Sequence, residues 1–113
     1  METPGQIVRE LTAIRQQSEK GIELLAQAEE KLARLQSEAE KIEASTFLKA
    51  QGTVADRTAL AKLEANNAHF EADLAKVEMN RIKTKLKHLS ESQMGVMAAA
   101  KLIELEWRQT GRT

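Results

Sequence analysis

Four basic side chains in the second half of the chain carry the strongest chemical signal. Arg81, Lys83, Lys85 and Lys87 alternate along seven residues, and no acidic residue interrupts them. Basic side chains on a helix can neutralise nucleic-acid phosphates, and each contact adds affinity that falls as salt rises. No aromatic residue lies among them, so base stacking is not indicated here. The alternative is that these four residues, named here the basic run, face solvent or pair with acidic residues elsewhere. Both interpretations stay open.

The histidines and acidic pairs do not form a catalytic or metal-binding pattern. His69 and His88 have no second His or carboxylate at a zinc-motif spacing, and we expect both to face solvent. The chain has no Cys, which excludes a thiolate nucleophile and a Cys-type zinc site. It also lacks a glycine-rich phosphate loop. We therefore predict no enzyme activity, no cofactor, no metal and no small-molecule substrate.

The composition is that of long helices. Among 113 residues there are 17 Ala and 13 Leu, but only three aromatic residues and one Pro. The net charge is zero, which gives no overall attraction to nucleic acid or anionic lipid. The opening METPGQIVRE has neither a basic start nor an apolar run, so it predicts no secretory signal, and no stretch is apolar enough for a membrane span. We expect a cytoplasmic protein, in the host cytoplasm if the chain is phage-encoded.

The apolar periodicity predicts a helix over about 6–49. Apolar and small residues recur in alternating steps of four and three, the 3.5-residue period of a coiled coil. We call this series the first seam, and it contains Ile7, Leu11, Ile14, Ser18, Gly21, Leu25, Ala28, Leu32, Leu35, Ala39 and Ile42. A tight turn follows at about 50–54, where Gly52 suits a left-handed position and Thr53 suits a helix N-cap. Such a short connection predicts antiparallel neighbours.

A second helix is expected over about 55–110, with a seam of its own. The second seam contains Ala61, Ala65, Ala68, Ala72, Ala75, Met79, Ile82, Leu86, Leu89, Gln93, Val96, Ala100, Ile103 and Trp107. Its phase never slips, yet Ser92 and Gly95 favour a break at 90–95. We therefore predict either a kink or a separate terminal helix there, and the periodicity does not decide between them. The predicted fold is all-α, a long antiparallel helical hairpin of coiled-coil type.

The first half of the second helix is apolar on two opposite faces. Opposite the alanine seam lies a second series that contains Asn67 and five apolar residues. We name the apolar residues the outer stripe: Leu60, Leu63, Phe70, Leu74 and Val77. A helix with two apolar faces needs partners on both sides, and a single hairpin offers one. This predicts a homo-oligomer of more than two chains. The alternative is that the alanines face water and merely raise helix propensity.

The end of the second helix extends past the expected start of the first. Ile103 and Trp107 fall in this overhang, and Trp is enriched among interface anchors. We predict that both residues belong to an oligomer or partner interface. The alternative is that a bend near Gly95 folds the segment back onto its own hairpin.

The second half of the chain resembles a class of small helical phage proteins. The stretches GTVADRTALAKLE and KLIELEWRQTGR share a glycine break, an Arg about five residues later and a terminal Trp-Arg pair with small all-helical phage early proteins encoded near recombination genes. The resemblance covers about residues 50–110 and points to phage recombination mediators. It implies an oligomer that binds single-stranded DNA and helps to load a recombinase. It marks Arg57, Trp107 and Arg108 as recurring positions, and Lys83, Lys85 and Lys87 as phosphate contacts.

Two further classes of function stay open beside a phage-type DNA-binding accessory protein. The main alternative is a coiled-coil structural, assembly or adaptor protein with no nucleic-acid role. Another is an inhibitor that blocks a host protein through a helical face.

Overall fold

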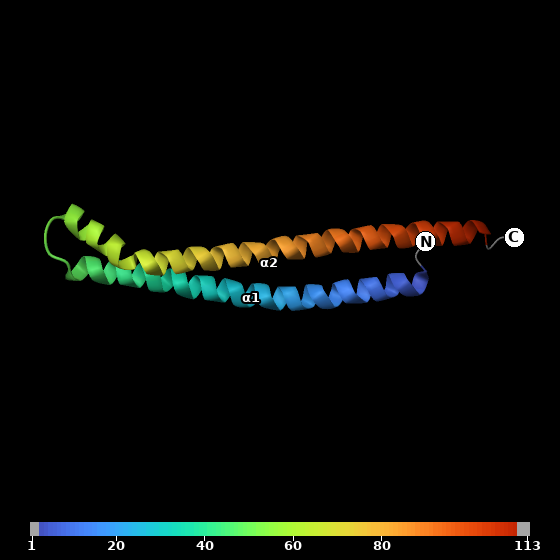
Figure 1. Cartoon of the computed structure of the whole chain (residues 1–113), viewed down its shortest axis with the longest axis horizontal. Helices are drawn as coiled ribbons and strands as arrows, with labels where there is room; N and C mark the ends of the chain where they lie inside the picture. Colours follow the sequence, from blue (N-terminus) through green and yellow to red (C-terminus); the bar gives the residue numbers. More distant parts are fainter. Residues whose placement is uncertain (1–2, 111–113) are drawn as a thin grey trace. The chain divides into compact units, whose positions relative to one another are not determined.

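The computed structural model describes residues 3–110, and its regular structure in that range is entirely helical (Figure 1). Helix α1 spans Pro4–Lys49 and helix α2 spans Val54–Thr110. These bounds lie within two residues of those expected from periodicity and turn residues. The predicted all-α hairpin is confirmed.

The chain divides into two compact units that share the two helices. Unit 1 contains the part of α1 up to Glu23 and the part of α2 from Lys83 onward. Unit 2 is the continuous segment Leu24–Ile82, which includes the turn between the helices. Each unit is described separately below.

The turn in unit 2 is built by Gly52 and a reciprocal helix cap. Gly52 has a φ of +113°, a conformation that residues with a side chain rarely adopt. The Thr53 hydroxyl accepts a hydrogen bond from the Asp56 backbone N–H at 3.2 Å, and the Asp56 carboxylate accepts one from the Thr53 N–H at 3.4 Å. The Asp56 carboxylate also lies in the first turn of α2, where negative charge is favourable. The sequence signals for this turn therefore correspond to observed hydrogen bonds.

Arg57 ties the start of α2 to the end of α1. Its Nε and Nη2 atoms donate to the Phe47 carbonyl oxygen at 3.1 and 2.9 Å. Its guanidinium carbon lies 4.2 Å from the centroid of the Phe47 ring. The last carbonyls of a helix lack intrahelical donors, so Arg57 satisfies one of them. This geometry gives Arg57 a structural role in the turn.

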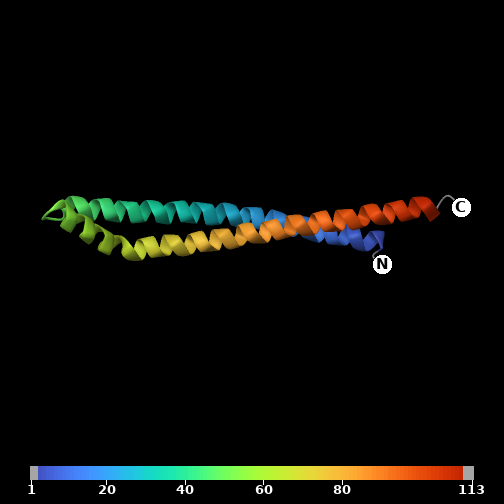
Figure 2. The same ribbon diagram turned by 90° about the horizontal axis from the view of Figure 1, so that it is seen from above.

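Small residues form the contact between the helices of unit 2 nearest the turn. Ala39 and Ala65 have no exposed surface, and Ala61 is 2% exposed. Figures 1 and 2 show the first turns of α2, in green, inclined to the rest of that helix before it runs alongside α1. Farther along, Leu32, Ala75 and Met79 form the buried core, with Leu25, Ala28 and Leu35 packed against it. All these residues belong to the two seams predicted from the sequence.

Unit 1 contains a notch at Gly21. A Cβ atom at this position would lie 2.6 Å from Cδ2 and 3.3 Å from Cγ of Leu86. Leu86 of α2 therefore occupies the space that any larger residue on α1 would need. Gly21 interrupts the first seam in the sequence, but its small size serves the packing in the structure.

Alanine substitutions at Gly21 and Gly95 should have different effects on stability. Alanine in a helix interior is favoured over glycine by about 1 kcal/mol. A Cβ at Gly95 has nothing within 4 Å, so Gly95→Ala should raise the free energy of unfolding. Gly21→Ala should be less stable than Gly95→Ala, because the Leu86 side chain must shift and the packing cost offsets the gain in helix propensity. Urea unfolding at one protein concentration measures both variants. An equal gain in stability would show that Leu86 does not fill the notch.

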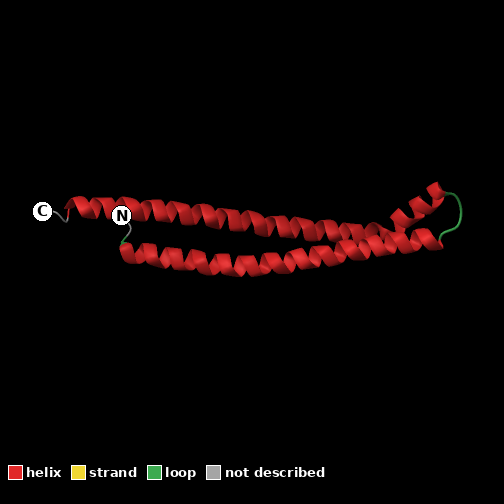
Figure 3. Cartoon of the chain, turned by 180° about the vertical axis from the view of Figure 1, so that it is seen from behind, coloured by secondary structure: helices red, strands yellow, loops and turns green. Residues whose placement is uncertain are grey.

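Helix α2 runs through residues 90–95 without interruption (Figure 3). The predicted alternative of a separate terminal helix is therefore wrong, and so is the folding back of the C-terminal segment. The unbroken 3–4 periodicity of the second seam continues across Ser92 and Gly95. One glycine costs about 1 kcal/mol within a helix, which the remaining residues of this long helix can offset.

Candidate interaction surfaces

The outer stripe forms an exposed apolar surface on unit 2. Its five side chains are 42–71% exposed. They lie on the opposite side of α2 from the alanines of the second seam, which pack against α1. The structure therefore places these five predicted residues on one helix face that α1 does not cover.

A groove beside the outer stripe extends this surface onto α1. Leu74 lines the groove together with Leu24 and Leu35 of α1. Lys31, Glu71 and Glu78 place charges in its lining. Because Leu74 belongs to both features, the stripe and the groove form one continuous apolar surface with a charged border. The exposed Leu24 side chain extends it to the first helix.

Unit 1 has an apolar groove of its own. Val8 and Ile22 of α1 and Met97 of α2 line it, together with Arg15 and Glu19. Val8, Ile22 and Met97 are each more than half exposed. The periodicity of the two seams does not predict this groove, because Val8, Ile22 and Met97 lie outside both of them. The groove can be recognised only when the register between the two helices is known, because residues of both helices line it.

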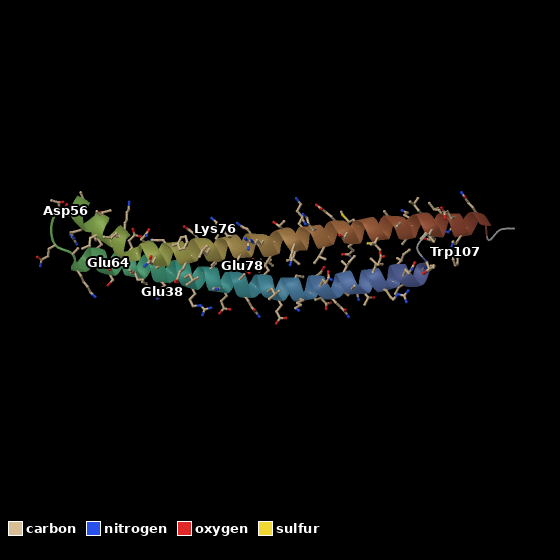
Figure 4. The ribbon with its side chains drawn as sticks, viewed as in Figure 1. Glu38, Asp56, Glu64, Lys76, Glu78 and Trp107 are labelled. Carbon is tan, nitrogen blue, oxygen red and sulfur yellow. The ribbon has the colours of Figure 1, made fainter. Side chains whose placement is uncertain are left out.

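The C-terminal end of α2 exposes large apolar side chains. Leu102 and Trp107 are each 63% exposed, while Ile103 is half-buried. Figure 4 shows Trp107 near the C-terminal end of α2. Trp107 is thus not buried by its own helical hairpin, although it continues the second seam. Neighbouring Arg108 donates to the Glu104 carboxylate at 2.7 Å in an exposed pair one helical turn apart.

The structure does not gather the basic run into one patch. Lys83, Lys85 and Lys87 are exposed in unit 1, and Arg81 is exposed in unit 2. Within residues 3–110, none of the four lies within 4 Å of an acidic side chain. Lys83 and Lys87 are four residues apart and share a side of α2. Lys85 lies about 200° around the helix from either, since each residue advances by about 100°.

His69 is more enclosed than the sequence suggests. Its Nε2 atom lies 3.1 Å from a carboxylate oxygen of Glu43, and the two side chains join α2 to α1 within unit 2. His88 is exposed as expected. In the described part of the chain, no group of three or more His, Asp or Glu side chains could hold a metal ion. The His69–Glu43 contact therefore belongs to the packing of the hairpin.

No protein family, curated protein or solved structure matches this chain. Its function is therefore inferred from the surfaces of the chain itself. Across residues 3–110, neither helix contains a segment long and apolar enough to cross a membrane.

Proposed function

We propose that this chain is a self-associating helical protein with a structural or assembly role. The observation that carries the proposal is the exposed outer stripe, which lies opposite a buried alanine seam on the same helix. Fully burying one large apolar side chain contributes about 1.5–3 kcal/mol. Five such side chains on one face favour burial against another helix over contact with water. A contiguous apolar patch of this kind is typical of a protein interface.

The lack of cysteine allows a direct test of whether the outer stripe is covered. Leu63→Cys places a single thiol on the stripe, and Ser37→Cys places one on an exposed position of α1. At high protein concentration a thiol reagent should modify Leu63→Cys more slowly than Ser37→Cys. Dilution should raise only the Leu63→Cys rate, because dissociation uncovers the stripe. Equal rates at all concentrations would contradict the proposal.

Binding of single-stranded nucleic acid is the second candidate function. Its supporting observation is the exposure of Lys83, Lys85 and Lys87, none of which is paired with an acidic side chain in the described residues. Under this proposal the chain is a phage-type accessory protein that resembles recombination mediators and cooperates with a recombinase in the host cytoplasm. Contacts of lysine with phosphate would supply sequence-independent affinity.

Changing Lys83, Lys85 and Lys87 together to alanine tests this second function. Affinity for an unstructured oligonucleotide should fall uniformly across sequences. The slope of log affinity against log salt should also flatten, by about 0.7 for each lost contact to a single strand. Fluorescence anisotropy at several salt concentrations measures both quantities. Unchanged affinity and slope would assign the three lysines to the solvated surface.

A further inference from the structure

The outer stripe has an acidic border. Glu64, Glu71 and Glu78 follow one another at seven-residue spacing on α2, and all three are exposed. Glu71 and Glu78 line the same groove as Leu74, so this acidic edge adjoins the stripe directly. Unit 2 as a whole contains ten acidic residues against eight Lys and Arg. Unit 2 therefore carries a small net negative charge.

The apolar surface of unit 1 has the opposite charge at its border. Its exposed side chains are Val8, Ile22, Met94 and Met97, at 55–62% exposure. On α2 the residues Lys83, Lys87, Met94, Met97 and Lys101 follow at steps of four, seven, three and four, so they share one side of the helix. Met97 lines the unit 1 groove, which places this side of α2 at its border. The three lysines form a basic edge.

Pairing two outer stripes with each other brings no electrostatic gain. In an antiparallel two-fold pair, the acidic edge of one chain faces the acidic edge of the other. In a parallel pair, it faces the opposite flank of the stripe, where Lys62 is offset by Asp73 and the other residues, Asn66 and Asn80, are uncharged. Like charges in an interface cost free energy, whereas complementary charges select the partner and fix the register. A surface with a basic border is therefore the better match.

We infer that the unit 2 surface of one chain docks on the unit 1 surface of a second copy. The outer stripe packs against Val8, Ile22, Met94 and Met97, and the acidic edge faces the basic edge. This contact joins two different surfaces, so two chains joined by it leave one surface of each kind free, and further contacts of the same type extend the assembly to a ring or a filament. The inference rests on the proposed self-association and specifies which two surfaces meet.

Charge reversal on each edge tests this arrangement. One variant carries Lys83→Glu, Lys87→Glu and Lys101→Glu, and the other carries Glu64→Lys, Glu71→Lys and Glu78→Lys. Each variant alone should associate at least about tenfold more weakly than the unmodified chain, because like charges then face each other. An equimolar mixture should recover the association, since both junctions between the two variants are complementary. Sedimentation equilibrium measures the masses, and circular dichroism verifies that both variants remain helical.

The control reverses three basic residues that belong to neither edge. Lys20→Glu, Arg34→Glu and Lys41→Glu make the same charge change on exposed positions of α1, and this variant should associate like the unmodified chain. If the unmodified chain associates and the Lys83, Lys87 and Lys101 variant associates equally well, the docking inference is wrong while self-association stands. If the mixture stays dissociated, the inference is also overturned. A monomeric unmodified chain would instead refute the proposed function.

Discussion

Replacing Leu63 and Phe70 together by glutamate should convert the assembled protein to single chains with unchanged helix content. Both side chains lie on the outer stripe and are at least 60% exposed, so the hairpin itself does not depend on them. An interface would bury them, and burying an unpaired carboxylate is strongly unfavourable. The association constant should therefore fall by several orders of magnitude. Light scattering measures the loss of mass, and circular dichroism measures the helix content.

A matched control makes the same charge change on α1. Ser37→Glu with Ala44→Glu also adds two carboxylates at exposed positions, but it removes no large apolar side chain. This variant should retain the mass of the unmodified protein. If both double variants associate equally well, the outer stripe is not an interface.

Replacing Ala65 by leucine should have the largest effect on the stability of the hairpin. Ala39 and Ala65 are fully buried, and each lies eight residues beyond the Phe47–Arg57 contact on its own helix. They therefore lie opposite each other in the antiparallel register, where only small residues let the helices approach closely. Leucine adds three carbon atoms without space to receive them. Overpacking of this kind lowers the free energy of unfolding by about 1–3 kcal/mol.

The comparison for this variant is Ala33→Leu. Ala33 is exposed on α1 within the same unit, and alanine and leucine have similar helix propensities. Urea unfolding should show Ala33→Leu close to the unmodified chain and Ala65→Leu clearly below it. Equal midpoints for the two variants would mean that the alanine seam is loosely packed.

Local periodicity and turn chemistry made most of the fold predictable. The 3–4 spacing of the two seams identified residues that are buried or half-buried, with Gln93 and Trp107 as exposed exceptions on α2. Gly52 and Thr53 marked the turn because a left-handed residue and an N-cap have distinct residue preferences. Gly95 was misleading, since glycine weakens a helix but does not have to end it.

Features that depend on contacts between the helices were less accessible from the sequence. Gly21 interrupts the apolar pattern of the first seam, and only the position of Leu86 opposite it explains why a small residue is needed there. The contact of Arg57 with Phe47 depends on the geometry of the turn, and the unit 1 groove depends on the register. The outer stripe was predictable because it repeats along a single helix. The identity of the molecule that covers the stripe depends on a contact between molecules. The structure of a single chain shows only which chemistry that molecule must have.

Sedimentation equilibrium of the unmodified chain across the micromolar range tests the central claim of self-association most directly. The mass of one chain is 12.6 kDa. The exposed outer stripe predicts a weight-average mass of at least twice this value, rising with concentration as chains are added. A mass of 12.6 kDa at every concentration would contradict self-association.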